Sequence, residues 1–226
     1  LRDGTQRSDL SLSCDDKIRI AQKLDELGVA FIEGGWPGSN PKDAEFFQRV
    51  QDLQWDHAVI AAFGSTCRAR GEPEDDANIR ALYDSEAKVC TLVGKSSVMH
   101  VQDVLRTTLD DNLRIIEKSI AFLSQHGRRV VYDAEHFFDG YKEDPVYALE
   151  TLRAAVRGGA ETLVLADTNG GSMPWEIEDL VRKVKDALNH PLGVHVHNDG
   201  ELGVANSLAG VRGGAMQVQG TINGYG

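Results

Sequence analysis

Short apolar runs, many of them β-branched, alternate with longer segments of mixed polarity along the whole chain. Runs of this length, bounded by polar residues or glycine, are typical of strands that are buried on both faces. We therefore expect strands at residues 29–32, 59–63, 89–93, 130–132, 162–165, 192–196 and 216–222.

The segments between these strands have helical patterns. In the first of them, Ile18, Ala21, Leu24 and Leu27 recur at every third position, which places them along one helix face. Comparable segments predict helices at residues 15–27, 41–53, 74–83, 109–125, 145–156, 174–187 and 201–212.

Several helix boundaries are marked by residues with special backbone preferences. Gly28, Gly127 and Gly158 stand where a C-cap glycine is expected, because glycine adopts the left-handed conformation without strain. Asp144 followed by Pro145 is typical of an N-cap and the first helical position.

Strand and helix repeat with a period of about 30 residues, which is the length of a βα unit. Seven strands are visible, and we expect the residues before Arg2 to supply the end of another. Eight units in one chain favour a (β/α)8 TIM barrel of about 250 residues over an open doubly wound sheet. No linker divides the chain, so residues 1–226 are interpreted as one barrel domain whose first strand and last helix are incomplete.

Composition narrows the range of partners. The chain has 35 acidic and 24 basic residues and a net charge of −11, which disfavours binding to nucleic acids or anionic membranes. The longest apolar run, residues 58–63, is far shorter than the roughly 20 residues of a membrane helix. Three widely spaced cysteines predict neither a disulfide framework nor a CxxC site, so we expect a cytoplasmic protein.

If the fold is a barrel, polar residues at the carboxyl ends of its strands form the site. His195 and His197 are two residues apart on a strand, so both imidazoles project from the same face. Alone, this spacing also fits two ordinary barrel histidines. Asp3 is expected at the end of a neighbouring strand, and two imidazoles with one carboxylate form a divalent-metal site.

Two motifs resemble a known enzyme family. They are Leu-Arg-Asp-Gly-Thr-Gln at residues 1–6 and Gly-Val-His-Val-His-Asn-Asp at residues 193–199. Both are similar to motifs of the metal-dependent barrels that make or cleave carbon–carbon bonds, among them 2-isopropylmalate, homocitrate and citramalate synthases and hydroxymethylglutaryl-CoA lyase. The stretches 32–43, 63–66, 132–141, 166–171 and 218–226 resemble the citramalate synthases most.

The resemblance implies a role for each matching residue. Asp3, His195 and His197 correspond to ligands of a divalent metal, Mg2+ or Mn2+ with Zn2+ as a substitute, which chelates a 2-oxo acid. By the same resemblance, Arg2 faces the developing alkoxide and Thr168 binds the substrate carboxylate. Glu135 helps to remove a proton from acetyl-CoA. Gln6 and Asn198 support the site.

The implied reaction is the condensation of acetyl-CoA with pyruvate to (R)-citramalate and CoA, a step towards isoleucine, by a homodimeric enzyme. A longer 2-oxo acid, as in isopropylmalate or homocitrate synthesis, is the alternative within enzymes. A barrel fragment without catalysis is the alternative outside them.

Individual residues also have structural interpretations. Arg2 and Glu135 can form a buried ion pair, Thr168 can cap a loop, and Asp167 can accept a structural hydrogen bond. Phe137 and Phe138 are interpreted as packing residues rather than as a surface that stacks on CoA.

Three departures from the family pattern stand out. The family's fourth metal ligand is an asparagine that would follow Gly226, and its downstream subdomain and regulatory domain would follow as well. Ser97 replaces a tryptophan of the family's Gly-Lys-Ser-Trp stretch. We therefore expect residues 1–226 alone to bind metal weakly and to show little turnover.

Overall fold

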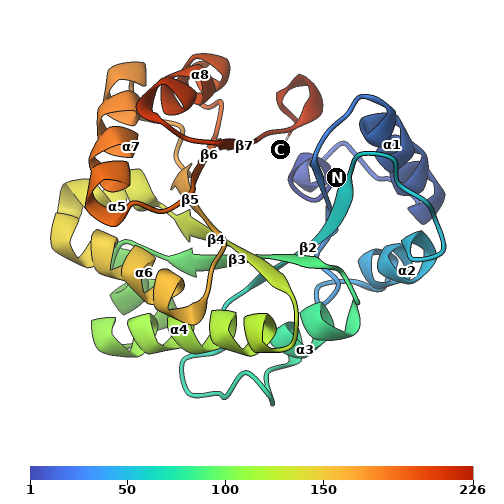
Figure 1. Ribbon diagram of the computed structural model, residues 1–226, viewed down its shortest axis with the longest axis horizontal. Coiled ribbons are helices and arrows are strands. Elements are labelled where there is room, and N and C mark those ends of the chain that lie inside the picture. Colours follow the sequence, from blue (N-terminus) through green and yellow to red (C-terminus); the bar gives the residue numbers. More distant parts are fainter. Residues whose placement is uncertain (226) are drawn as a thin grey trace.

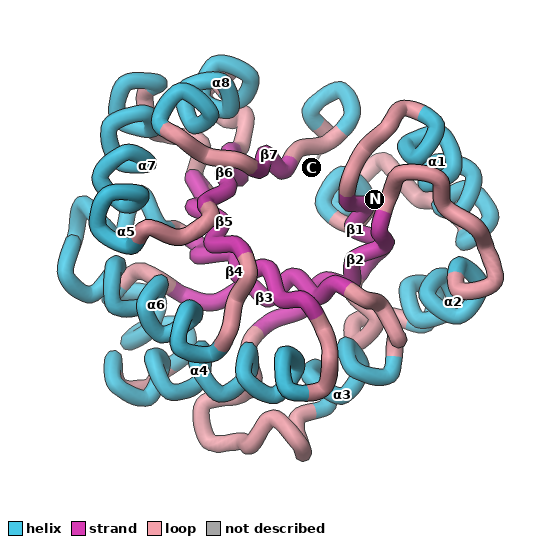
Figure 2. The backbone as a smooth tube through the Cα atoms, viewed as in Figure 1, coloured by secondary structure: helices cyan, strands magenta, loops and turns pink. Residues whose placement is uncertain are grey.

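The computed structural model describes residues 1–225, in which seven parallel strands form one sheet, ordered β1 to β7 as in the sequence. Figures 1 and 2 show that this sheet curls around a central axis and that helices surround it. The strands are β1 (Phe31–Gly35), β2 (Val59–Ser65), β3 (Val89–Lys95), β4 (Arg129–Glu135), β5 (Thr162–Asp167), β6 (Leu192–Val196) and β7 (Gln217–Gln219). The arrangement is that of a TIM-type barrel, which confirms the predicted fold class.

One helix precedes β1, and helices connect each strand to the next. They are α1 (Cys14–Glu26), α2 (Pro41–Val50), α3 (Ala77–Asp84), α4 (Leu109–Gln125), α5 (Phe137–Glu143), α6 (Pro145–Gly158), α7 (Pro174–Leu188) and α8 (Gly203–Gly213). Two 3-10 turns, η1 (Asp3–Gln6) and η3 (Ile222–Gly224), and a π-helical segment, η2 (His100–Leu105), complete the elements. None of the described helices is long and apolar enough to cross a membrane.

The predicted caps hold at most boundaries. Asp144 accepts hydrogen bonds from the amides of residues 146 and 147, and Gly28 and Gly127 have φ angles of 85° and 79°. The C-cap of α6 is Gly159, with φ 95°, and not Gly158 as expected. Gly158 serves another purpose, because a Cβ there would come within 2.6 Å of the carbonyl oxygen of Glu117 on α4.

Three further features of the structure differ from the sequence-based expectations. The last strand was expected to reach residue 222 but ends at Gln219, because Gly220 and the left-handed Asn223, at φ 58°, turn the chain into η3. Helix α5 was missed, since seven residues are too few for a helical repeat to be distinguished from a loop. No described strand carries Asp3, which lies in η1.

The two ends of the described chain lie side by side, as Figure 1 indicates. The guanidinium carbon of Arg7 is 5.1 Å from the centre of the Tyr225 ring, and a Cβ on Gly4 would be 3.5 Å from Thr221. Within residues 1–225, strands β1 and β7 nevertheless do not pair with each other. The N-terminal turn, rather than a strand, therefore stands between these two edges.

The interior of the barrel is apolar at the amino ends of the strands. A cluster of Ala61, Val89, Val131 and Val164, with Phe31 and Val59 packed against it, closes this end. A second and larger cluster fills the space between the sheet and the helices. We call the first cluster the floor of the barrel.

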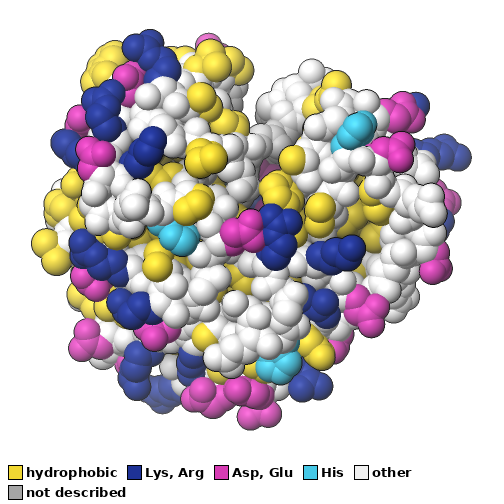
Figure 3. Space-filling model, in the orientation of Figure 1, with side chains coloured by type: hydrophobic (Ala, Val, Ile, Leu, Met, Phe, Trp, Pro, Cys, Tyr) yellow, Lys and Arg dark blue, Asp and Glu magenta, His cyan; other side chains and the backbone are white. Residues whose placement is uncertain are grey.

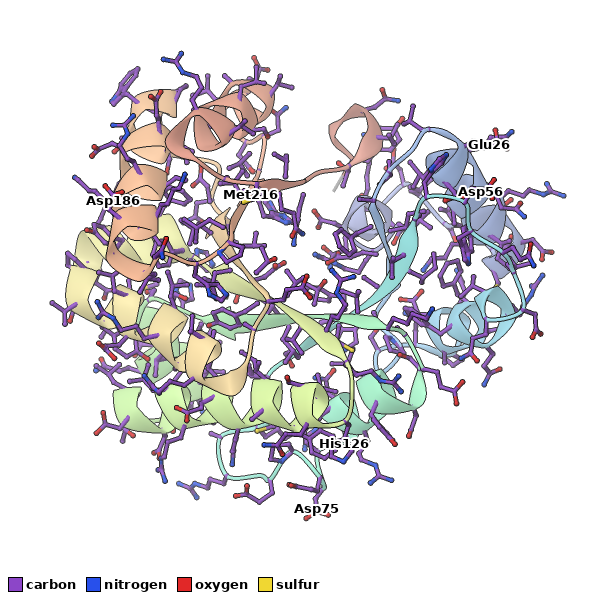
Figure 4. The ribbon with its side chains drawn as sticks, in the orientation of Figure 1. Glu26, Asp56, Asp75, His126, Asp186 and Met216 are labelled. Atoms are coloured by element: carbon purple, nitrogen blue, oxygen red, sulfur yellow. The ribbon has the colours of Figure 1, made fainter. Side chains whose placement is uncertain are left out.

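Apolar side chains are also exposed around β7. On α8, Val204, Leu208 and Val211 are at least half exposed, and Met216, labelled in Figure 4, is 85% exposed directly before β7. Figure 3 shows hydrophobic side chains over this part of the molecule, with charged side chains beside them.

Candidate active and metal site

A cavity of about 580 Å³ opens at the carboxyl ends of the strands. It is lined by every residue that was assigned a catalytic, substrate-binding or metal role, namely Arg2, Asp3, Gln6, Glu135, Thr168, His195 and His197. Apolar side chains such as Phe63, Val93 and Leu105 form part of the same wall. These residues form part of the polar wall of the cavity, and we call its opening at the carboxyl ends of the strands the mouth of the barrel.

Asp3, His195 and His197 converge at the mouth. One donor atom from each residue lies within 4.8 Å of the other two, and Asp3 Oδ2 is 3.4 Å from His195 Nε2. Donor atoms bound to one ion at about 2.1 Å stand ~3 Å apart, so a small movement of these side chains would complete a site. Two imidazoles and a carboxylate are a suitable donor set for a divalent cation. Among residues 1–225 this is the only such cluster.

Charges in the cavity are strongly coupled. Burial alone would raise the pKa of Asp3, but the hydrogen bond to His195 and the charge of Arg2 lower it to about 2. Burial would lower the pKa of His195, but its hydrogen bond to Asp3 and the charge of Asp133 raise it to about 9. This pocket thus favours positive charge beside Asp3, and a bound divalent cation would provide it.

Arg2 is held by three contacts. Its Nε donates to Glu33 Oε2 at 3.1 Å, and its Nη1 donates to Asp3 Oδ1 at 3.2 Å. The guanidinium carbon lies 3.7 Å from the centre of the Phe63 ring. The alternative ion pair between Arg2 and Glu135 is therefore wrong, because Arg2 pairs with Asp3 and Glu33 instead.

Glu135 forms an ion pair with Lys95. Lys95 ends β3, stands directly opposite Glu135 in the register of β3 and β4, and donates from Nζ to Glu135 Oε2. Both side chains line the cavity and are about one quarter exposed. The strand register thus holds this carboxylate at the mouth.

Asp167 accepts a structural hydrogen bond, as expected, whereas Thr168 bonds to the loop after β4 and not to the loop that follows it. Thr168 Oγ1 accepts a hydrogen bond of 2.8 Å from the amide of His136, and Asp167 Oδ2 accepts one of 3.1 Å from the amide of Ser172. Thr168 also lines the cavity, so its hydroxyl hydrogen is available for a ligand.

Other predicted residues have structural contacts. Phe137 and Phe138 are buried and pack in the core, as expected. Asn198 Oδ1 accepts from the amide of Gly203 at 2.9 Å and supports the loop after β6. Ser97 is buried and donates to Glu143 Oε2 at 2.9 Å, so a polar contact occupies the position of the family's tryptophan.

Two functional neighbours were missed by sequence reasoning. His195 Nδ1 is 2.8 Å from Gln219 Oε1, and Gln219 Nε2 donates to Asp133 Oδ1 at 2.9 Å. Asp133 is 4% exposed, and burial together with the charge of Glu33 raises its pKa to about 7. An acidic residue in the middle of an apolar strand, two positions before Glu135, was the available signal.

A family model described as HMGL-like matches residues 1–226. The chain belongs to the HMGL-like family. The (R)-citramalate synthase of Geobacter sulfurreducens is 53% identical over 226 residues, which make up 100% of this chain and 43% of that relative. The probable 2-isopropylmalate synthase of Methanopyrus kandleri is 34% identical over 226 residues, again 100% of this chain and 43% of the relative.

Solved structures support the fold of this HMGL-like chain. Hydroxymethylglutaryl-CoA lyase from Pseudomonas aeruginosa has a TM-score of 0.80 and 22% identity, over 100% of this chain and 75% of the other. At this identity the likeness establishes the barrel alone. The chain spans less than half the length of these two synthases.

Proposed function

We propose that this chain is the catalytic barrel of an enzyme that condenses acetyl-CoA with pyruvate to give (R)-citramalate and CoA. The convergence of Asp3, His195 and His197 in a cavity shared with Arg2 and Glu135 carries the proposal. Pyruvate is favoured as the 2-oxo acid because the chain is 53% identical to a citramalate synthase but 34% identical to a probable isopropylmalate synthase.

The setting of this activity follows from the same proposal. Residues 1–226 form one catalytic domain, and the enzyme is a cytoplasmic homodimer that serves isoleucine synthesis. No described helix is long and apolar enough to cross a membrane. The net charge of −11 disfavours nucleic acid as a partner.

Asp3, His195 and His197 hold the divalent cation in this proposal, with Mg2+ or Mn2+ preferred and Zn2+ as a substitute. When bound, the cation supplies Lewis-acid polarisation of the ketone of the 2-oxo acid. Thr168 donates its hydroxyl hydrogen to the carboxylate of this substrate, while its oxygen stays bonded to the amide of His136. Gln6 lines the same cavity and contributes a further polar contact.

Glu135 arranges the removal of a methyl proton from acetyl-CoA, and Lys95 keeps its carboxylate directed into the cavity. The methyl carbon that loses the proton attacks the ketone carbon, so a carbon–carbon bond forms and the π bond of the ketone breaks. The ketone oxygen becomes an alkoxide, which takes up a proton to give the hydroxyl group of the product. Water then cleaves the thioester and releases CoA.

Arg2 stabilises the alkoxide. Two of its five N–H groups are used by Glu33 and Asp3, which leaves donors for the substrate oxygen. Because Phe63 stacks against the guanidinium, the plane of these donors is set before the substrate arrives. Such preorganised charge is worth about 3–4 kcal/mol in comparable sites.

The test replaces His197 in the full polypeptide that carries this chain. His197→Ala should abolish metal-dependent release of CoA from acetyl-CoA and pyruvate, because a protein ligand of the metal is lost. His57→Ala is the matched control, since its side chain is exposed and distant from the cavity lining. Undiminished CoA release by His197→Ala would refute the ligand assignment.

Substrate choice is tested with the unaltered polypeptide. CoA release should be fastest with pyruvate, and faster release with 2-oxoisovalerate or 2-oxoglutarate would assign a longer 2-oxo acid. Release that persists in full after exhaustive chelation would contradict the role of the metal. Binding of Mn2+ without release from any of the three acids would favour a barrel without this catalysis.

A further inference from the structure

Gln219 connects the proposed metal site to a buried carboxylate on the other side of the cavity. It stands directly opposite His195 in the register of β6 and β7, and its side chain spans from His195 Nδ1 to Asp133 on β4. Strands β5 and β6 lie between β4 and β7 in the sheet, but Ala166 of β5, in register with His195, has a small side chain. The amide can therefore reach Asp133 across the barrel interior.

The chemistry of the three groups sets their orientation. Asp133 Oδ1 accepts a hydrogen bond from Nε2 of Gln219 at 2.9 Å, so the NH2 end of the Gln219 amide is turned towards Asp133. The amide oxygen then faces His195 and accepts its Nδ1–H at 2.8 Å. This leaves His195 Nε2 directed at Asp3 Oδ2, at 3.4 Å, where a cation would bind.

We propose that Gln219 and Asp133 are positioning residues that hold His195 with its Nδ1 protonated and its Nε2 aimed at the metal position. The inference rests on the proposed metal role of His195. Neither residue touches the metal position itself: each acts through the next, as outer groups do in metal sites where their loss weakens affinity 10–100-fold.

The experiment uses the full polypeptide with histidine labelled in 15N, and Mn2+ as the probe for affinity. Gln219→Leu removes the acceptor and should weaken Mn2+ binding by about 10–100-fold in calorimetry. In the metal-free protein the Nδ1–H resonance of His195, protected from exchange in the wild type, should disappear. Asp133→Asn should weaken binding less, because the Gln219 amide can then turn either way.

An exchange of the two groups separates positioning from packing. Gln219→Glu alone places two carboxylates together and should impair binding. Combined with Asp133→Asn, the new carboxylate accepts from His195 and the new amide donates to it, so the hydrogen-bond directions are restored. The double variant should bind Mn2+ within about threefold of the wild type and regain the Nδ1–H resonance. Failure of this rescue in a folded protein would overturn the proposal.

Mn2+ binding by the wild type tests the metal site, and Mn2+ binding by Gln219→Leu tests the positioning role. A wild type that binds no Mn2+ overturns the metal role of His195, and with it the positioning that depends on this role. Normal Mn2+ binding by Gln219→Leu with an unchanged Nδ1–H resonance overturns the positioning alone. Wild-type melting temperature in circular dichroism confirms that each variant is folded.

Discussion

The floor and the mouth of the barrel are built from the same strands but differ in polarity and in the contacts that hold their side chains. On β4, the residues Val131, Asp133 and Glu135 share one face, and they pass from the apolar floor through a buried carboxylate to a partly exposed one. At the floor, side chains pack and exclude water. At the mouth, hydrogen bonds and ion pairs hold charges in fixed positions.

The difference teaches that stability and chemistry can be separated along a single strand. The floor residues have no polar atom in their side chains and are held by burial. The mouth keeps groups whose burial is costly unless they are paired, such as Arg2 with Glu33 and Lys95 with Glu135. Substitutions at the mouth should therefore strongly affect kcat, whereas substitutions at the floor should affect the free energy of unfolding alone.

The largest effect is expected at the mouth, for Arg2→Ala in the full polypeptide. Loss of the fixed charge beside the developing alkoxide should lower kcat for CoA release by about 10²–10³-fold. The melting temperature should fall as well, because Asp3 and Glu33 lose their partner, so kcat is measured at temperatures where circular dichroism shows that the variant is folded. Arg182→Ala, an exposed position on α7, is the matched control. A kcat for Arg2→Ala within threefold of the control would contradict the separation.

A smaller effect is expected at the floor, for Val164→Ala. Val164 is fully buried, and removal of two carbon groups leaves a cavity, so the free energy of unfolding should fall by about 2 kcal/mol. The kcat of the folded protein should stay close to that of the wild type. Val146→Ala, at a position 71% exposed, should change stability by less than about 0.5 kcal/mol. Denaturant unfolding and initial rates measure the two quantities.

The smallest effect concerns a carboxylate on the floor side of the molecule. Asp25 accepts hydrogen bonds from the amides of Asp56, His57 and Ala58, before β2, and these lower its pKa. Because the pKa is lower in the folded protein, the stabilisation is present above the usual carboxyl range and is lost as the pH falls through the folded pKa.

Asp25→Asn should therefore lower the melting temperature slightly at neutral pH, and this difference should shrink as the pH is lowered. Asp186→Asn is a suitable control, since Asp186 is exposed near the end of α7, as Figure 4 shows. A difference that stays constant from neutral pH to pH 2 would indicate that ionisation of Asp25 contributes nothing.

Much of the site was accessible from local patterns. The alternation of strand and helix predicted the barrel, and two histidines two residues apart predicted imidazoles on one face. Their convergence with Asp3 followed from the expectation that the first and last units of a barrel are neighbours, although Asp3 lies in a turn and not at a strand end.

The partners of these residues were not accessible in the same way. Lys95 with Glu135 depends on the register of β3 and β4, and Gln219 with Asp133 depends on contact across β5. The incorrect pairing of Arg2 with Glu135 shows the same limit, because charge alone does not choose among carboxylates.

The sequence by itself determined which residue types face the interior of the barrel, because side-chain direction alternates along a strand and recurs along a helix. The same local rule placed the imidazoles of His195 and His197 on one face of a strand. Only the tertiary structure decided which groups meet: Glu33 with Arg2, Lys95 with Glu135, and Gln219 between His195 and Asp133. These contacts join residues 24–86 positions apart, and their distances are set by the curvature and register of the whole sheet.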